Sequence, residues 1–299
     1  MFKKIVIFGV GLIGGSFALA LKKAAAVECV VGIGRSEKSL QRAKQLGIID
    51  VISTDVAQAV EAADLILIAA PVAQTEVILA ALAPYLQVGT VVTDAGSTKT
   101  DVVVAARKVL GNKIGQFIPG HPIAGRELNG PDAALAELYI GKKTVLTALP
   151  ENAADDVARV AKAWQLCGSV IHYLSPEEHD KVFAAVSHLP HLLAFALVDD
   201  IAKKPHAALL FQYAASGFRD FTRIAGSSPE MWRDVSLANQ TALLGELDAY
   251  MAQLTQLRGL LVNADGAGME AIYSNAQQAR HNWICTIESA EKKPSEGGD

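Results

Sequence analysis

The chain has 299 residues, of which 51% are hydrophobic and 19% are charged, and its formal net charge is −4. This length is enough to bury the cores of two domains, and the charge leaves no basic surface for nucleic acid or an anionic membrane. The three cysteines, Cys29, Cys167 and Cys285, lie far apart in apolar surroundings, which predicts buried, inert thiols and a reducing compartment.

The first part of the chain alternates short apolar runs with stretches of helical periodicity. Strands are predicted at residues 4–8, 29–33, near 51, 65–70, 89–94 and 115–119, and helices at 12–25, 38–46, 56–62, 75–82 and 99–109. This alternation predicts βαβ units that form a Rossmann-type α/β domain, a doubly wound, mostly parallel sheet with helices on both faces.

The pattern changes near residue 174. Two further strands, 143–149 and 170–174, are predicted on either side of a helix at 153–167, and Ser175 then opens a long helical region as an N-cap followed by proline. We therefore expect a dinucleotide-binding domain at 1–174 and an all-α domain at 175–287. The remainder, 288–299, is predicted to be a disordered tail because alanine is its only apolar residue type.

The start of the chain and its most apolar helix bear on localisation. The sequence enters a strand within a few residues of Met1, which leaves no room for a signal peptide. The apolar stretch at 182–198 is interrupted by His188, Pro190 and His191, so we expect no membrane span. Together these features predict a cytoplasmic protein.

A glycine-rich turn follows the first predicted strand and opens a helix. It reads Gly9-Val-Gly11-Leu12-Ile13-Gly14 and fits G-x-G-x-x-G in the context that the motif requires. Glycines there allow a tight turn and a close approach of the backbone to a pyrophosphate at the positive end of the helix. We assign these residues to the binding of a dinucleotide cofactor.

The end of the second strand distinguishes the two nicotinamide dinucleotides. NAD-binding domains place a carboxylate there for the ribose 2′-hydroxyl, whereas this chain has Arg35 and Ser36, with no acid before Glu37. The guanidinium of Arg35 can pair with a 2′-phosphate, and Ser36 can add a hydroxyl. The prediction is that NADP is preferred and that NAD is not strictly excluded.

Three loops leave carboxyl ends of strands in the second part of the first domain: 69–72, 94–99 and 120–125. Ligands of a doubly wound sheet bind at this edge, so Ser97 and His121 are expected to face the nicotinamide from neighbouring loops. Histidine is suited to accept a proton near neutral pH, and the serine could orient it or hold a substrate hydroxyl. We therefore predict an oxidoreductase with His121 as its base.

The helical half carries a second group of motifs, SHLPH at 187–191, GFRDFTRIA at 217–225 and PEMWRD at 229–234. From the residues alone, Arg219, Arg223 and Arg233 are equal candidates for holding a carboxylate. Metal binding is not expected, because His188 and His191 stand without a third ligand.

Together with DAGSTK and GHPIAG, these motifs closely resemble the prephenate/arogenate dehydrogenase family of tyrosine biosynthesis over residues 4–285. The resemblance implies oxidative decarboxylation of a cyclohexadiene and a homodimer formed through the helical domain, which its alanine- and leucine-rich helix at 238–261 also favours. It implies that His121 is the base, that Ser97 binds the ring hydroxyl and that Arg223 holds a carboxylate. It also implies that His188 and Trp232 line the substrate pocket.

Two other functions remain possible at this point. Another dehydrogenase with a Rossmann domain and a helical domain would act on a hydroxy acid or imine but would not need GHPIAG and SHLPH together. A non-catalytic nucleotide sensor would not need both His121 and Arg223. Prephenate and arogenate differ by a keto or amino group, for which Glu127 and Asp220 are candidate acidic partners, and the sequence assigns no role to Arg126. It leaves open feedback inhibition by tyrosine as well.

Overall fold

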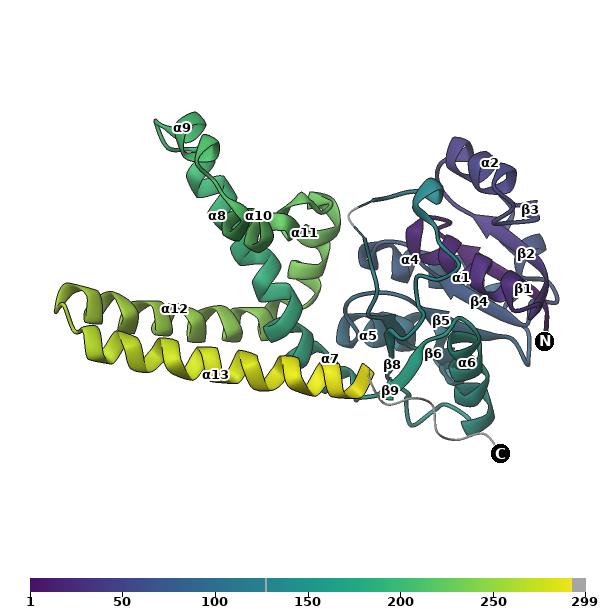
Figure 1. The fold of residues 1–299 in the computed structure, drawn as a ribbon. Helices are drawn as coiled ribbons and strands as arrows, with labels where there is room; N and C mark the ends of the chain where they lie inside the picture. Colours follow the sequence, from purple (N-terminus) through teal and green to yellow (C-terminus); the bar gives the residue numbers. More distant parts are fainter. Residues whose placement is uncertain (127, 292–299) are drawn as a thin grey trace. The chain divides into compact units, whose positions relative to one another are not determined.

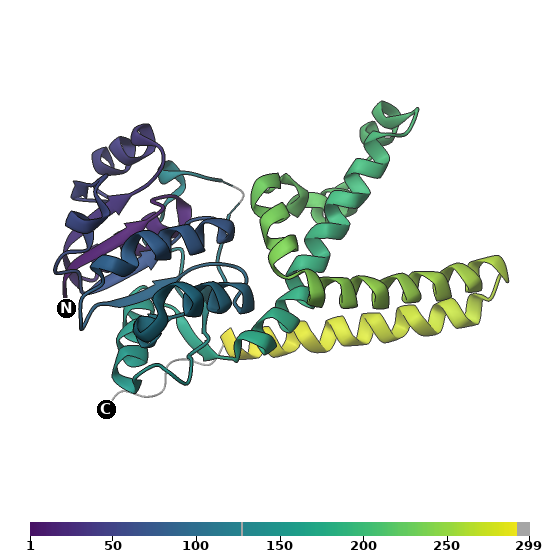
Figure 2. The same ribbon diagram turned by 180° about the vertical axis from the view of Figure 1, so that it is seen from behind.

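The computed structural model describes residues 1–126 and 128–291. It divides into two compact units, Met1–Leu243 and Leu244–Asp299. Figures 1 and 2 show the ribbon from opposite sides. All of the sequence-predicted site residues that the structure describes belong to the first unit.

A six-stranded parallel sheet forms the centre of the first unit (Figure 1). Its order is β3-β2-β1-β4-β5-β6, the doubly wound arrangement that the alternation of elements predicts. The strands are β1 (Phe2–Phe8), β2 (Val27–Ile33), β3 (Val51–Ile52), β4 (Leu65–Ile68), β5 (Val91–Asp94) and β6 (Phe117–Ile118). The predicted α/β fold class is therefore confirmed.

Helices cover both faces of this sheet, which explains why successive residues in the middle of its strands are apolar. In β1, Ile5 and Ile7 belong to one core, and Val6 and Phe8 belong to the other. The first core includes side chains of α1 (Leu12–Lys23) and α6 (Ala154–Leu166), and the second includes side chains of α4 (Thr75–Leu82) and α5 (Thr100–Leu110). The other α-helices around the sheet are α2 (Glu37–Gln45) and α3 (Val56–Val60).

A second, three-stranded sheet lies next in the chain. It consists of β7 (Gly120–Pro122), β8 (Lys143–Leu146) and β9 (Val170–Tyr173), with β7 antiparallel to β8. His121 is therefore a strand residue paired with Val145, and not a loop residue as the sequence suggests. The predicted strand at 115–119 shortens to β6 because 111–116 form a 3₁₀ turn.

Every described element after β9 is helical. Ser175 begins this region with the expected N-cap, a capping box in which its side chain and that of Glu178 satisfy each other's backbone amides. Within the first unit this region contains α7 (Pro176–Phe183), a π-helix at Ala184–His188, α8 (Leu189–Ala202), α9 (Ala207–Gln212), α10 (Ser216–Thr222), a 3₁₀ turn at Arg223–Gly226 and α11 (Pro229–Ala238). The predicted domain boundary at 174 thus marks a change of secondary structure, whereas the two compact units divide after Leu243.

The second unit is a helical hairpin. It contains most of α12 (Gln240–Val262) and α13 (Gly266–Glu291), which run side by side in both views (Figures 1 and 2). Helix α13 extends through residues 288–291 of the predicted tail, and 292–299 lie outside the described residues. Cys285 is exposed on α13, contrary to the expectation of a buried thiol, whereas Cys167 is buried in the first unit and Cys29 is partly buried there.

The stretch Pro176–Ala202 is long and apolar enough to cross a membrane by length and composition, with a hydropathy of 1.6 over its most apolar window. Interior helices of water-soluble proteins meet the same criterion. Here the stretch buries His179, Asp180 and His188, each less than 5% exposed, and all three make hydrogen bonds.

Candidate active site

Two glycines of the turn after β1, Gly9 and Gly14, have no room for a side chain. Gly9 has a φ of +93°, and a Cβ there would lie 2.5 Å from the carbonyl oxygen of Ala69. A Cβ on Gly14 would lie 2.3 Å from the carbonyl oxygen of Gly9. Gly11, by contrast, faces open space and caps α1 without any side-chain hydrogen bond, so the amides of Leu12 and Ile13 begin the helix uncapped. This cradle of free amides at a helix start fits a pyrophosphate.

Arg35 and Ser36 lie exposed after β2, at the same edge of the sheet. Ser36 caps α2, where its hydroxyl oxygen accepts a hydrogen bond from the amide of Ser39 at 3.2 Å. Farther along α2, the guanidinium of Arg42 binds Asp132. Arg42 is therefore engaged in an ion pair within the protein, whereas no ion pair of Arg35 is found among the described residues.

His121 begins a chain of hydrogen bonds that runs into the helical region. Its Nδ1 lies 2.8 Å from Nε2 of His179, and Nδ1 of His179 lies 2.8 Å from Oδ1 of Asp180. Phe183, one turn later in α7, packs on both imidazoles, with ring centroids 4.9 Å from His121 and 4.5 Å from His179. His121 is partly exposed, whereas His179 is completely buried.

The carboxylate at the end of this chain is fixed at the start of α5. The two oxygens of Asp180 accept hydrogen bonds from the amides of Lys99 and Thr100, both at 2.8 Å. These amides are orphan donors of the first helical turn, so Asp180 caps α5 from α7. The chain from His121 to Asp180 therefore joins β7, α7 and α5.

A buried ion pair fixes the loop after β5 and the start of β7. The ammonium of Lys99 binds the carboxylate of Asp94, and the two side chains are 0% and 1% exposed. Asp94 also accepts hydrogen bonds from the amides of Gly96 at 2.8 Å and Gly120 at 3.0 Å. One carboxylate thus fastens the loop that carries Ser97 to the strand that carries His121.

The surroundings keep both imidazoles neutral. Burial lowers the pKa of His121 well below its ordinary value, and the neighbouring His179, Lys99 and His188 lower it further. Burial also lowers the pKa of His179, although Asp180 opposes this shift. Burial alone would raise the pKa of Asp180, but hydrogen bonds from His179, Thr100 and Lys99 lower it overall. The carboxylate is therefore ionised at neutral pH, and the imidazoles can accept protons.

His188 lies beyond this chain, in the π-helix. Asn239 places its amide nitrogen 2.8 Å from the carbonyl oxygen of Asp180 and 3.1 Å from Nδ1 of His188. Burial lowers the pKa of His188 to about 4, while Asp180 and the backbone of Ser97 oppose the shift. Nε2 of His188 has no hydrogen-bond partner in the described structure. The structure thus brings Ser97 next to His188, and its hydroxyl makes no hydrogen bond to His121.

Trp232 and His191 lie next to His188 and form an aromatic cluster with it. Their rings stack with centroids 3.6 Å apart, and Trp232 meets His188 edge-on at 6.0 Å. Burial lowers the pKa of His191, and the charge of Arg223 lowers it further, which places that arginine nearby. The buried Nε1 of Trp232 is without a hydrogen-bond partner in the described part of the chain.

Arg219 and Arg233 each lie beside an acid that is next to them in the chain. The guanidinium of Arg233 binds the buried carboxylate of Asp234 at 2.6 Å. Arg219 lies 3.9 Å from Asp220, and both side chains are exposed. Of the acids considered for amine recognition, Asp220 is therefore beside an arginine, and Glu127 lies outside the described residues.

The sequence-predicted residues His121, Ser97, His188, Trp232 and Arg223 thus lie on neighbouring elements of one unit. Residues that the sequence interpretation missed connect them: Asp94, Lys99, His179, Asp180 and Asn239. Asp94 and Lys99 belong to the DAGSTK motif, and His179 and Asp180 follow the capping box of Ser175. The sequence shows that these residues are polar, but it does not show which residues they contact. No group of three metal-ligating side chains occurs in the described ranges.

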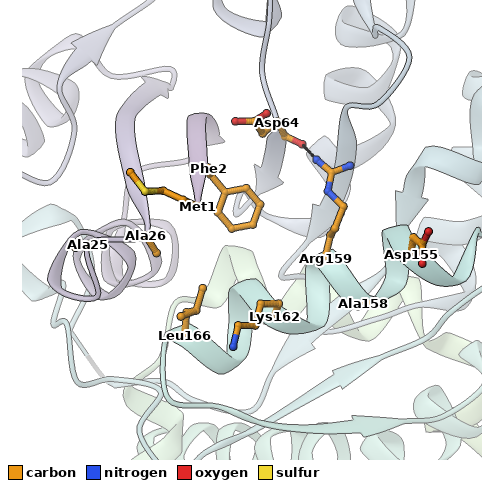
Figure 3. A pocket seen from close by; sticks show the side chains of 10 residues that line it. All are labelled: Met1, Phe2, Ala25, Ala26, Asp64, Asp155, Ala158, Arg159, Lys162 and Leu166. Atoms are coloured by element: carbon orange, nitrogen blue, oxygen red, sulfur yellow. Dashed lines mark hydrogen bonds between the residues drawn. The ribbon is translucent and has the colours of Figure 1, made fainter.

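A separate hollow opens at the amino end of β1, away from these residues (Figure 3). Phe2, Asp64, Arg159 and Lys162 are among the residues that line it, and Arg159 donates a hydrogen bond to the backbone carbonyl of Asp64 at 3.2 Å. The cofactor turn and the histidines lie at the carboxyl ends of the strands, so this hollow is not part of the candidate active site.

Comparison with known proteins matches both parts of the chain to domains of the same enzyme family. The family model of the prephenate dehydrogenase nucleotide-binding domain matches residues 17–173, and that of the prephenate dehydrogenase dimerization domain matches residues 175–274. A cyclohexadienyl dehydrogenase of Zymomonas mobilis is 38% identical over 282 residues, covering 94% of this chain and 96% of that protein.

Solved structures agree. The prephenate dehydrogenase of A. aeolicus in complex with hydroxyphenyl propionate and NAD+ has a TM-score of 0.84 at 36% identity, covering 96% of this chain and 98% of that one. The arogenate dehydrogenase of Synechocystis has a TM-score of 0.78 at 29% identity, with 94% and 99% covered. The chain belongs to the prephenate dehydrogenase family of nicotinamide-dependent oxidoreductases.

Proposed function

We propose that this enzyme catalyses the oxidative decarboxylation of prephenate, arogenate or both, to 4-hydroxyphenylpyruvate or tyrosine. The observation that carries the proposal is the neutral, partly exposed imidazole of His121, hydrogen-bonded to His179 at the carboxyl edge of the sheet. A neutral histidine at this edge is suited to take the proton of a substrate hydroxyl. The names of the relatives, which include cyclohexadienyl, prephenate and arogenate dehydrogenases, support this substrate class.

The residues of the chain need only orient the substrate and move one proton. His121 takes the proton of the ring hydroxyl as that carbon is oxidised, and the bound nicotinamide supplies the acceptor for the hydride. Loss of the ring carboxylate as carbon dioxide leaves its electron pair in the ring, and the phenolate oxygen recovers a proton from His121. Aromatisation drives the reaction, so positioning is the main task of the protein.

Arg223 is the proposed partner of a substrate carboxylate. Its charge lowers the pKa of His191, which places it close to the group formed by His191, His188 and Trp232. Ser97 is proposed to bind the ring hydroxyl, and His188 and Trp232 to line the pocket. The unpartnered nitrogens of His188 and Trp232 support this assignment, because buried polar atoms normally have partners.

The cofactor is proposed to be NADP by preference, with NAD also accepted. The support is the exposed Arg35 after β2, where a guanidinium fork can bind a 2′-phosphate, beside the hydroxyl of Ser36. Steady-state kinetics with each substrate and each cofactor test these finer points. A lower KM for NAD than for NADP would contradict the preference.

The enzyme is further proposed to be a cytoplasmic homodimer. The match of residues 175–274 to a dimerization domain supports the dimer. The biosynthetic role of its relatives supports the compartment.

Replacement of His121 tests the proposed base. His121→Asn should lower kcat by about 10²–10⁴, the usual contribution of a positioned base, with little change in the substrate KM. His172→Asn, at an exposed position of β9, is the matched control and should keep full activity. A His121→Asn enzyme with near-normal kcat would refute the assignment.

A further inference from the structure

His179 and Asp180 are both buried but have no role in the reaction as proposed so far. His179 lies within hydrogen-bond distance of the base, and Asp180 is hydrogen-bonded to His179. The hydrogen bonds around them determine which nitrogen of each imidazole carries hydrogen. The ionised carboxylate oxygens of Asp180 can only accept hydrogen bonds. Amides of Lys99 and Thr100 hold this carboxylate in place at 2.8 Å.

Because Asp180 accepts, Nδ1 of His179 must donate to it across 2.8 Å. A neutral imidazole carries one hydrogen, so Nε2 of His179 is then bare and can only accept. Its partner at 2.8 Å is Nδ1 of His121, which must therefore carry hydrogen. The same rule leaves Nε2 of His121 with a free lone pair.

We infer that His179 is a positioning residue that holds His121 in the tautomer whose Nε2 can accept the substrate proton, with Asp180 setting the direction of the chain. This inference rests on the proposed role of His121 as base. Without the chain, Nε2 of a neutral His121 could itself carry hydrogen, and the base would be blocked. Both histidines are neutral at neutral pH, because burial lowers the pKa of each.

The same chain accommodates the charge that catalysis creates. When Nε2 of His121 takes the hydroxyl proton, the ring becomes an imidazolium whose Nδ1–H donates more strongly to His179. The proton can also shift to Nε2 of His179, which remains a donor to Asp180 through Nδ1. In either arrangement the hydrogen-bond chain carries one positive charge and ends at the carboxylate of Asp180. The proton can later return to His121 along the same hydrogen bonds.

Two substitutions of His179 separate the bond to His121 from the bond to Asp180. Glutamine places its amide near the position of the imidazole Nε2, so the side-chain oxygen of His179→Gln can accept from His121. Asparagine places its amide near the position of Nδ1, so His179→Asn can still contact Asp180 but does not reach His121. The two variants have the same functional group and differ by one methylene.

We expect His179→Asn to lower kcat by at least about tenfold with a nearly unchanged substrate KM, whereas His179→Gln retains most of kcat. Both should keep the wild-type Tm within a few degrees. If the pair have equal kcat, or if both match the wild type, His179 does not position the base.

Nitrogen-15 NMR of the histidine rings tests the tautomer directly and needs no substrate. At neutral pH the His121 ring of the full-length protein, assigned by its loss in His121→Asn, should show a protonated Nδ1 and a bare Nε2. His179→Asn should shift the ring toward the other tautomer, and His179→Gln should not. A protonated Nε2 in the wild type would overturn the inference, whatever substrate the enzyme uses.

Discussion

His188 is a buried histidine whose protonation the fold opposes. Its pKa is lowered to about 4 mainly by burial, whereas an unfolded chain binds the proton below the ordinary value of 6.5. Unfolding therefore takes up a proton between these two values, and stability falls as pH decreases through this window. His121 and His179 are shifted in the same direction and add to the loss.

We expect the share of His188 in this loss to be about 2 kcal/mol of unfolding free energy between pH 7 and pH 5. Urea unfolding at both pH values measures it, and His188→Gln should lose that much less stability than the wild type over the interval. His206→Gln removes an exposed histidine instead and should behave as the wild type does. Equal pH dependence in His188→Gln and the wild type would contradict the shift.

Single residues differ in how far the sequence alone could identify them. His121 lies between a glycine and a proline in a recognisable motif, so the sequence alone identifies it as a candidate functional residue. Its partner His179 is 58 positions away and follows an ordinary helix start. Nothing local distinguishes such a side chain from a solvated helical histidine, because its role depends on a contact that only the folded chain makes.

At the scale of elements, one buried ion pair connects the loop after β5 with β7. Asp94 accepts hydrogen bonds from Gly96, Gly120 and the ammonium of Lys99, and both charged side chains are inaccessible to solvent. Removing one member of such a pair leaves the other charge buried without compensation. The pair is therefore expected to hold the two elements at fixed spacing.

Replacing Lys99 by methionine should lower the unfolding free energy by about 3–5 kcal/mol, because the Asp94 carboxylate then lacks its counter-ion. Chemical denaturation at neutral pH measures the change. The double variant Lys99→Met, Asp94→Asn, which removes both charges, should recover part of the loss. A single variant as stable as the wild type would show that the backbone amides alone suffice for Asp94.

The elements of the parallel sheet were predictable because strands buried on both faces are continuous apolar runs. The three-stranded sheet was harder to predict, since β7 has only three residues and pairs with β8 across the connecting residues 123–142. Residues 117–125 contain two prolines and two glycines, which do not resemble a strand. The sequence around His121 therefore does not predict its pairing with Val145.

At the scale of the whole molecule, the second unit presents apolar side chains that its own hairpin does not cover. Met251 and Leu254 of α12 are 55% and 46% exposed within the single chain, and Trp283 of α13 is 58% exposed. Large exposed apolar side chains of this kind are typical of an interface between subunits. This agrees with the dimer proposed above.

Two charges placed on that surface should therefore dissociate the dimer. We expect Met251→Lys combined with Leu254→Lys to change the mass measured by light scattering from that of two chains to that of one. Gln253→Lys adds a charge to the same helix at a polar exposed position and should leave the mass unchanged. A double variant that remains a dimer would place the interface elsewhere.

The π-helix at Ala184–His188 interrupts a helical rod that otherwise runs from Pro176 to Ala202. Pro190 accounts for part of it, because proline cannot donate to the carbonyl four residues earlier. A π-turn carries one residue more than an α-turn, and each residue of a helix turns the chain by about 100°. Deleting a single residue here would restore a regular helix but rotate His191 away from the direction set by His179. The number of residues between His179 and His191 therefore sets the angle between their side chains around the helix axis. Insertion or deletion of a residue would change this angle, whereas a substitution would not.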